Sequence, residues 1–181
     1  IALIAVSAWI TIPLGPVPFT LQMLSITFVI CILSPKEAIA AIYGYELLGA
    51  IGIPVFSGMR AGIGVLLGPT GGFLLGYLIG VPLAVGFLHI MRKSSIVSSN
   101  AWARTLCCIA AGLIFTIVAY VFGTVQYMLV ANVGLEVALA TSVIPFIVPD
   151  IAKVAIAAVC AQTVLAALGM ANSAERSSDR A

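Results

Sequence analysis

Long apolar runs, separated by short polar or Pro- and Gly-rich breaks, make up most of the chain. Six runs can be distinguished, at residues 1–12, 19–33, 36–51, 72–91, 105–131 and 137–168. A mostly uncharged run of about 20 residues is typical of a transmembrane helix, because a helix of that length crosses the roughly 30 Å of bilayer hydrocarbon. The pattern therefore predicts six transmembrane helices. The first run is short and begins at Ile1, so whether its helix starts upstream is left open.

Composition supports a membrane protein. Of the 181 residues, 62% are hydrophobic and only 8% are charged, and the mean hydropathy is +1.24. Soluble domains carry about 25% charged residues, so this chain lacks the polar surface that water requires. The net charge of +2 gives no reason to expect a nucleic-acid partner. We predict an all-α integral membrane protein, with one domain at residues 1–171 and a polar cytoplasmic tail at 172–181.

The basic residues predict an orientation in the membrane. With six spans, all but one of the basic residues at or beyond the ends of the apolar runs fall on the same side, namely Lys36, Arg92, Lys93, Arg104, Arg176 and Arg180. Cytoplasmic loops carry the excess of Lys and Arg, so that side is predicted to be cytoplasmic. The expected location is a bacterial cytoplasmic membrane, crossed several times, with both termini inside. Arg60 alone then lies in a loop on the outer side.

Asp150 and Lys153 are charged residues within an otherwise apolar run, TSVIPFIVPDIAKVAIAAV. A charge at membrane depth costs roughly 2.5–3.5 kcal/mol on insertion scales, so such residues are paired, hydrated or bound to a ligand. Their i, i+3 spacing places both on one face of a helix. Pro145 and Pro149 precede them and loosen the local backbone. Two interpretations remain open at this point: a ligand site, or an internal ion pair that joins two helices.

Two unusual loops are predicted on the same outer side. The first, PLGPVPFTLQ, is stiffened by three prolines and leads Thr20 and Gln22 into the second run. The second, at residues 52–71, is long and glycine-rich and contains Arg60. Loops longer than about 12–15 residues are usually functional. Because Asp150 and Lys153 lie just below this side, we predict an outward-facing ligand pocket that the two loops cover.

Three further residues are candidates for ligand contact. Glu46 is a second acid within an apolar run, and it faces the pocket, pairs with Lys153 or is kept protonated by burial. Gly71 lies in the string GPTGG, where free N–H groups at a helix start suit an anion, or where a tight turn allows close helix packing. Tyr127, like Gln126 and Tyr120, is a candidate for the pocket wall, although tyrosines at this depth more often pack or anchor.

No catalytic or metal site is predicted. The string GPTGG lacks the lysine of a nucleotide-binding loop, so no ATP site is expected. The four cysteines lie in apolar runs without metal-ligand spacing, and His89 is the single histidine. We see no grouping of nucleophile, base and acid that would support an enzyme. No cofactor is therefore expected.

Three strings resemble the BioY family of biotin transporters, namely GPVPFTLQ, GAIGIPVFSGMRAGIGVLLGPTGGFLLGY and FIVPDIAKVAIA. Members are substrate-binding S components of energy-coupling-factor transporters. The resemblance implies six transmembrane helices and an outward biotin pocket, capped by the loops after the first and third spans. It implies that Asp150 and Lys153 form the ligand pair and that Arg60 belongs to the capping loop. Glu46 departs from the family pattern, and Ala2, Ala5 and Ala8 match its partner-docking face only loosely.

The resemblance implies biotin as the ligand and high-affinity biotin uptake as the function. A carboxylate such as Asp150 accepts hydrogen bonds from the ureido N–H groups of biotin, while Lys153 or Arg60 balances its carboxylate tail. The implied partners, besides the lipid bilayer, are a membrane coupling subunit and ATPase subunits, although action without them is left open. The alternatives are an S component for another vitamin, or a structural subunit whose Asp150–Lys153 pair serves assembly.

Overall fold

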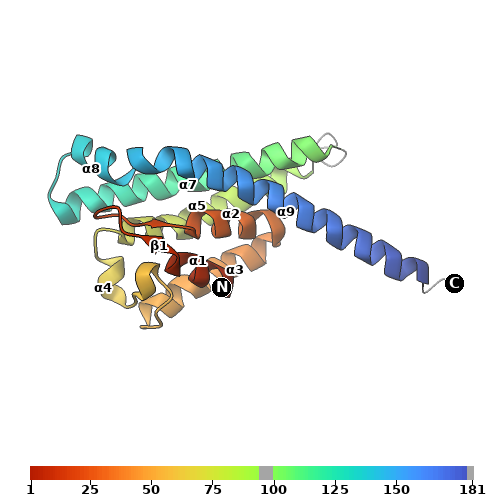
Figure 1. The fold of residues 1–181 in the computed structure, drawn as a ribbon, viewed down its shortest axis with the longest axis horizontal. Helices are drawn as coiled ribbons and strands as arrows, with labels where there is room; N and C mark the ends of the chain where they lie inside the picture. The colour runs from red at the N-terminus through yellow and green to blue at the C-terminus, as the bar shows by residue number, and fades with distance from the viewer. Residues whose placement is uncertain (94–99, 179–181) are drawn as a thin grey trace.

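The computed structural model describes residues 1–93 and 100–178, with side chains as far as Gly169. Figure 1 shows an elongated helical bundle in which three long helices run side by side. The elements in chain order are α1 (Ala2–Trp9), β1 (Thr11–Ile12), β2 (Phe19–Thr20), α2 (Gln22–Ile32), α3 (Pro35–Ala50), η1 (Ser57–Met59), α4 (Ile63–Leu66), α5 (Gly71–Met91), α7 (Ala101–Ala131), α8 (Leu135–Ser142) and α9 (Ile144–Ser178).

Glycines allow α5 and α7 to pack against each other closely. Gly72, Gly76 and Gly80 recur every fourth residue on α5, so they share one face of the helix. A Cβ atom at Gly72 would lie 2.3 Å from the carbonyl oxygen of Phe122, and one at Gly76 would lie 2.8 Å from the Cα of Ala119. Small residues at this spacing are the usual way for membrane helices to approach, because lipid provides no hydrophobic force between them.

The same device brings α2 and α9 onto the other side of α7. A Cβ atom at Gly112 of α7 would lie 2.7 Å from Val154 of α9 and 2.8 Å from Thr27 of α2. The buried core around this junction includes Ile26, Ala158 and Ala161. The helices α2, α7 and α9 therefore meet at Gly112, where the absence of a side chain lets them approach closely.

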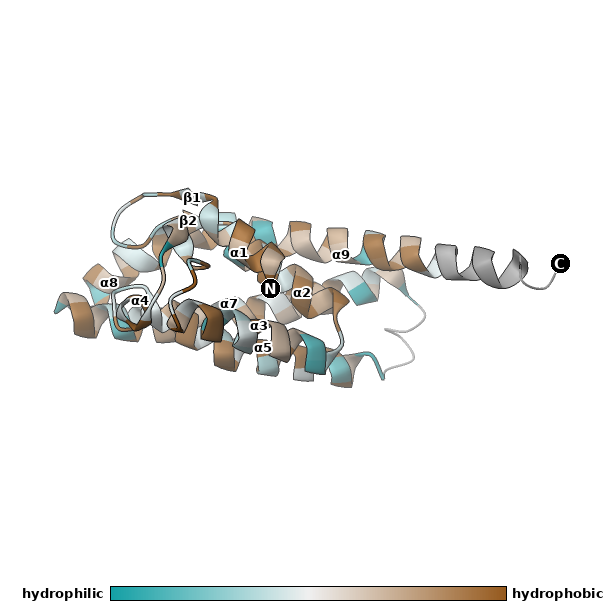
Figure 2. Cartoon of the chain, turned by 90° about the horizontal axis from the view of Figure 1, so that it is seen from below, coloured by the Kyte–Doolittle hydropathy of each residue, from teal (hydrophilic) through white to brown (hydrophobic). Residues whose placement is uncertain are grey.

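The surface of the bundle is apolar while several polar side chains are buried, which is the reverse of a soluble domain. Figure 2 shows hydrophobic residues along most of the helices, and many of them are exposed, with both Leu129 and Val148 at 77%. By contrast, Gln22, Asp150 and Lys153 are at most 6% exposed. Such a distribution is stable where the surroundings are hydrocarbon.

Three helices, α5, α7 and α9, are long and apolar enough to cross a membrane among the residues that the structure describes. The prediction of six spans is therefore supported in part. The helices α2 and α3 have 11 and 16 residues, or about 16 and 24 Å of helix, which is shorter than the roughly 30 Å of hydrocarbon. The helix α1 has 8 residues.

The predicted sixth run is divided by a break. The helix α8 ends at Ser142, Val143 has non-helical angles of φ −128° and ψ −58°, and α9 begins at Ile144. Pro145 falls in the first turn of α9, where its missing N–H group has no helical partner to lose. Pro145 thus suits the start of α9, while Pro149 lies inside the helix and Asp150 falls within its second turn. The fifth run also begins earlier than predicted, at Ala101, because Asn100 caps α7 by accepting from the N–H of Trp102.

Irregular segments gather at one end of the bundle, at the left in Figure 1, where β1, α4 and α8 lie. The strands β1 and β2 pair antiparallel, with Thr11 opposite Thr20 and Ile12 opposite Phe19. The long loop after α3 is fastened below this hairpin, because Phe56 packs directly on Gly49 and the indole N–H of Trp9 donates to Pro54 O at 2.8 Å. Residues 94–99 of the predicted polar connection lie outside the described residues, as do the last three of the predicted tail, 179–181.

The glycine contacts give a first prediction. Gly76→Ala should lower the free energy of unfolding by about 1–3 kcal/mol, because the added methyl group meets the α7 backbone. Gly86→Ala is the matched control, since it lies in the same helix and a Cβ there would meet no atom within 4 Å. That variant should be neutral or up to about 1 kcal/mol more stable. Thermal unfolding of both variants in detergent tests this, and equal melting temperatures would show that the α5–α7 contact does not depend on glycine.

Candidate ligand-binding site

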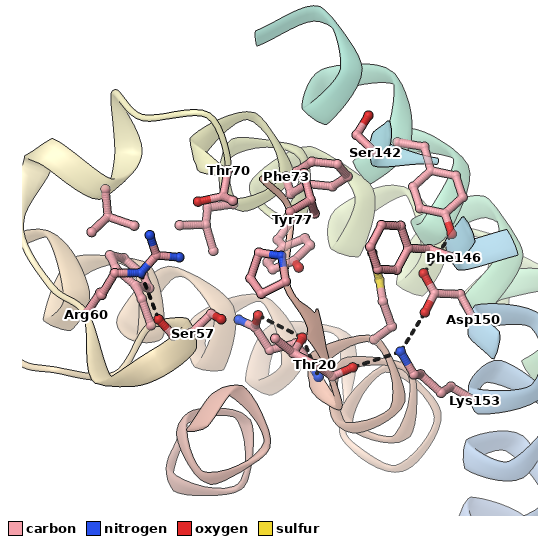
Figure 3. A pocket seen from close by; sticks show the side chains of 18 residues that line it. Thr20, Ser57, Arg60, Thr70, Phe73, Tyr77, Ser142, Phe146, Asp150 and Lys153 are labelled. Carbon is pink, nitrogen blue, oxygen red and sulfur yellow. Dashed lines mark hydrogen bonds and ion pairs between the residues drawn. The ribbon is translucent and has the colours of Figure 1, made fainter. Parts of the chain in front are cut away.

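A cavity lies beneath the hairpin and the long loop, at the end of the bundle where the irregular segments gather. Figure 3 shows side chains from both loops and from α2, α5, α7 and α9 pointing into it. Counted out to its open mouth, its space is about 600 Å³, of which only about 60 Å³ admits the centre of a water-sized sphere. It is therefore narrow. The lining residues are Val17, Pro18, Thr20, Gln22, Met23, Phe56, Ser57, Arg60, Val65, Thr70, Phe73, Leu74, Tyr77, Tyr120, Ser142, Phe146, Asp150 and Lys153.

Asp150 and Lys153 form a buried ion pair on one side of this cavity. The Lys153 ammonium donates to Oδ1 of Asp150 at 2.7 Å, one helical turn away on α9. Lys153 is 6% exposed and Asp150 is 4% exposed. The ammonium also donates to the carbonyl oxygen of Thr20 at 2.8 Å and stands 3.6 Å from the centroid of the Phe19 ring. The pair therefore does two things: it neutralises itself, and it holds strand β2 against α9.

The second carboxylate oxygen of Asp150 is bonded from α7. The Tyr120 hydroxyl donates to Oδ2 at 2.7 Å, and Tyr120 packs edge-on against Phe73. Asp150 thus receives donors from two helices, as a buried carboxylate requires. An ionised carboxylate has about four lone-pair directions, so it can still accept from a ligand in the cavity.

Gln22 belongs to a second polar group, at the start of α2. Its side-chain amide donates to the Tyr45 hydroxyl at 2.7 Å, and that hydroxyl donates to Val55 O at 3.0 Å. The Thr20 hydroxyl donates to the Gln22 amide oxygen at 3.2 Å. These bonds connect the hairpin, α3 and the long loop behind the cavity. They also fix the direction in which the Gln22 amide faces the cavity.

Arg60 lies at the mouth. It is exposed, and its Nε–H donates to Ser57 O at 3.0 Å within the long loop. Figure 3 shows the guanidinium end of Arg60 directed toward the cavity from the loop side, across from Asp150 and Lys153. The loop reaches this position through tight turns at Gly58 and Gly62, with φ of +67° and +91°, angles that glycine adopts without strain.

The structure brings four of the seven candidate residues together at this cavity: Asp150, Lys153, Arg60 and Gln22. Glu46, Gly71 and Tyr127 are not among the lining residues. Glu46 is 6% exposed and borders a separate groove between α3 and α5, but both of its carboxyl oxygens are buried. Gly71 begins α5 with the Leu66 carbonyl directly against it, which is close packing of a turn. Tyr127 is buried in the core of α7, and its neighbour Gln126 donates to Leu66 O and Gly68 O at 2.7 and 2.8 Å.

The remaining walls are apolar and aromatic. Phe73 and Tyr77 come from α5, Phe146 from α9 and Met23 from α2. A site with aromatic walls, a buried carboxylate–ammonium pair and a cation at its mouth suits a small molecule with a flat polar head, an apolar body and an anionic end. Among the described residues, no three His, Cys, Asp or Glu side chains lie together as a metal site.

Comparison with known proteins identifies the family. The family model described as "BioY family" matches residues 1–170. The chain belongs to the BioY family. Its relatives include the "Biotin transporter BioY" of Thermotoga maritima, 36% identical over 88% of this chain and 88% of that protein. Another is the "Probable biotin transporter BioY" of Pyrococcus horikoshii, which is 38% identical over 90% of this chain and 89% of that protein. The family resemblance that we drew from the sequence is thereby confirmed.

A solved structure has the same fold. It is the crystal structure of the S-component for biotin from an ECF-type ABC transporter, and it aligns with a TM-score of 0.76 at 27% identity. The alignment covers 90% of this chain and 85% of that one. The relatives of this BioY chain are thus transporter components, in line with the expectation that it is not an enzyme.

Several cavity residues were not singled out from the sequence. They are Phe73, Tyr77, Phe146 and Ser142. Each belongs to an apolar run in which the sequence does not distinguish a cavity residue from other aromatic or hydroxyl residues. Tyr45 carries the hydroxyl that orients Gln22, but the sequence does not distinguish it from Tyr43, the other tyrosine of AIYGYELL. Periodicity could have found Phe146, which lies four residues before Asp150 on the same face of α9. Phe73 and Tyr77 lie in α5, where no candidate residue marks the face that lines the cavity.

The ion pair gives a second prediction, about stability alone. Lys153→Met should destabilise the chain by about 3–5 kcal/mol, because it leaves the Asp150 carboxylate buried without its cation. The double variant Asp150→Asn with Lys153→Met should recover much of that loss. Lys36→Met, at the exposed start of α3, is the control for losing a lysine and should be within about 0.5 kcal/mol of wild type. A double variant no more stable than Lys153→Met would show that the pair is not a self-neutralising unit.

Proposed function

We propose that this BioY chain binds biotin in the described cavity and takes part in its uptake as the substrate-binding component of an ECF-type transporter. The observation that carries the proposal is the Asp150–Lys153 pair facing Arg60 across a pocket with aromatic walls. The biotin transporters among its relatives and the solved S-component for biotin support biotin over another vitamin. A purely structural subunit would need the ion pair but no cavity beside it. Because Asp150 and Lys153 line a cavity, a ligand-binding role is favoured.

The charge pattern of the cavity matches the two ends of biotin. The ureido ring offers two N–H donors and one carbonyl acceptor. Asp150 accepts from the N–H groups, while Lys153, which spends two of its three N–H bonds on Asp150 and Thr20, donates to the carbonyl with the third. Hydrogen bonds to charged groups contribute about 1.5–3 kcal/mol each. The walls formed by Phe73, Phe146 and Met23 hold the apolar ring and chain.

We assign the biotin carboxylate to Arg60. Lys153 is committed deep in the site, whereas the outer nitrogens of the Arg60 guanidinium lie at the mouth, beyond its Nε bond to Ser57. A guanidinium offers two parallel N–H groups to a carboxylate, which is the geometry of a bidentate pair. Because the cavity is narrow, biotin enters only when the capping loop and hairpin shift outward. The hairpin is tied to Lys153 through Thr20 O, so ligand contact with Lys153 bears directly on that cap.

The orientation and the partners belong to the same proposal. We place the cavity end on the outer side of the cytoplasmic membrane and the loops with Lys36, Arg92, Lys93 and Arg104 on the cytoplasmic side, because Lys and Arg concentrate there. The solved structure comes from an ECF-type ABC transporter, which supports a membrane coupling subunit and ATPases as partners. Of the alanines that loosely match a docking face, Ala5 and Ala8 are buried in this fold. Those two residues are therefore not available to a partner in this arrangement.

The third prediction tests the ligand. The purified chain should bind biotin with one-to-one stoichiometry in titration calorimetry. Asp150→Asn with Lys153→Met should lower the affinity at least about a hundredfold, because two charge-assisted contacts are lost. Lys36→Met should leave the affinity unchanged. Retention of wild-type affinity by the folded double variant would mean that the pair is structural and the site is elsewhere.

The same titrations with biotin amide, which lacks the anionic tail, assign the cation. Wild type should discriminate against the amide by roughly tenfold or more, and Arg60→Gln should remove that discrimination. If Arg60→Gln still prefers biotin to its amide by the same factor, Lys153 holds the carboxylate and the ligand lies the other way round.

The fourth prediction tests the orientation. In a chain whose four native cysteines are replaced by alanine, one cysteine is introduced either at Met59 (63% exposed, beside Arg60) or at Lys93, and intact cells are treated with a membrane-impermeant thiol reagent. The Met59→Cys variant should be labelled, and the Lys93→Cys variant should be labelled only after the cells are opened. Labelling of Lys93→Cys alone in intact cells would reverse the proposed orientation.

A further inference from the structure

One side-chain hydroxyl joins the two loops that cover the cavity. It belongs to Thr11, which lies in strand β1 of the hairpin and is not among the cavity-lining residues. Its Oγ1 donates to the carbonyl oxygen of Ala8 at 2.6 Å. The same oxygen lies 3.2 Å from the Ser57 hydroxyl and accepts from the N–H of Gly58 at 3.2 Å. Residues that are 46 and 47 positions apart in the sequence therefore meet at this atom.

The bonding capacity of this hydroxyl is fully used. A threonine hydroxyl has one O–H donor and two lone pairs. Because the proton of Thr11 goes to Ala8, the Ser57 hydroxyl is the donor in its contact with Thr11. Thr11 thus donates once and accepts twice. A valine has nearly the same shape and can form none of these bonds, whereas a serine can form all three.

The segment that Thr11 holds is the turn that carries Arg60. Ser57, Gly58 and Met59 form the short helix η1, and none of them is buried. The carbonyl oxygen of Ser57 accepts from the Nε–H of Arg60 at 3.0 Å, a bond that Figure 3 shows beside the cavity. Ser57 is therefore bonded to Arg60 through its carbonyl group and to Thr11 through its hydroxyl group. The position of the guanidinium depends on Thr11 through this one intervening residue.

The backbone of this turn is strained and needs such a contact. Met59 has a φ of +58°, in the left-handed region, directly after Gly58 at +67°. For a residue other than glycine this conformation is uncommon, and it persists where surrounding contacts enforce it. Met59 is 63% exposed, so packing of its own side chain does not enforce it. The bond from the N–H of Phe56 to Arg60 O closes the turn on itself, and Thr11 fastens the turn to the hairpin.

The base of the long loop is anchored independently of Thr11. Phe56 packs directly on Gly49. The indole N–H of Trp9 donates to Pro54 O at 2.8 Å. Loss of the Thr11 hydroxyl should therefore release the turn without detaching the loop or unfolding the bundle. The contact is placed to control the direction of the guanidinium.

We propose that Thr11 is a positioning residue for recognition of the ligand's carboxylate. It holds the turn so that Arg60 is directed into the cavity, and it thereby favours an anionic ligand without touching it. This inference rests on the proposed function, in which Arg60 binds the carboxylate of biotin. A guanidinium that is already held in place binds more tightly than a free one, because less conformational freedom is lost on binding.

Affinities for biotin and biotin amide, measured by titration calorimetry, test this role. Thr11→Val should lower the affinity for biotin by about three- to tenfold, the effect of about one net hydrogen bond, and should leave the affinity for the amide nearly unchanged. Thr11→Ser, which keeps the hydroxyl, should retain the wild-type ratio of the two affinities. Thr163→Val is the matched control, because its exposed hydroxyl donates to Val159 O of its own helix, and it should bind both ligands like wild type.

A cycle with Arg60→Gln separates positioning from a general effect on the fold. Once Arg60 is replaced, Thr11→Val should have no further effect on the affinity for biotin. The proposal is overturned if folded Thr11→Val binds biotin like wild type, weakens both ligands equally, or weakens biotin as much without Arg60 as with it. An unchanged preference for biotin in Arg60→Gln would instead overturn the proposed carboxylate contact, and this inference with it.

Hydrogen exchange of the wild-type chain gives a test that needs no variant. Coupling between two contacts is reciprocal, so a carboxylate bound to Arg60 should stabilise the turn and slow exchange of the Gly58 amide. With each ligand at saturation, biotin should slow this amide at least about threefold more than biotin amide does. Equal exchange with the two bound ligands would contradict the role of Thr11, even if Thr11→Val does not fold.

Discussion

The buried ammonium of Lys153 is the interaction on which the ligand end of the molecule depends. It joins three elements, because it donates to Asp150 one turn earlier on α9 and to Thr20 O in strand β2, and it stands over the ring of Phe19. A lysine in an apolar interior requires partners of this kind, since unpaired it would be strongly disfavoured. The hairpin that covers the cavity is thus held in place by the same charge that the ligand is proposed to meet.

The helices supply a rigid frame for that contact. Glycines at the crossings of α5 with α7, and of α7 with α2 and α9, let backbones approach until added methyl groups would clash. In hydrocarbon this close packing replaces the hydrophobic force that holds soluble domains together. Tyr120 on α7 then reaches Oδ2 of Asp150 at 2.7 Å. The position of one hydroxyl group in the site therefore follows from the size of residues several turns away.

Two buried acids in the same bundle have opposite surroundings. Asp150 accepts from Lys153 and from Tyr120, whereas both carboxyl oxygens of Glu46 are buried without a hydrogen-bond partner among the described residues. Hydropathy alone does not distinguish the two residues, because each is an acid within an apolar run. Of the two, only Asp150 lines the candidate cavity.

The sequence by itself determined the membrane class and the family, and it marked Asp150 and Lys153, because a charge within an apolar run is costly and therefore easy to recognise. It also placed the two covering loops through their prolines and glycines. Only the tertiary structure decided the break at Val143, the helix lengths that give three clear membrane helices among the described residues, and the absence of Glu46, Gly71 and Tyr127 from the cavity lining. It alone selected Phe73, Tyr77 and Phe146 as walls. The physical reason is that an entirely apolar helix has no polar face to reveal its rotation, so the direction of each side chain is fixed by close packing between helices.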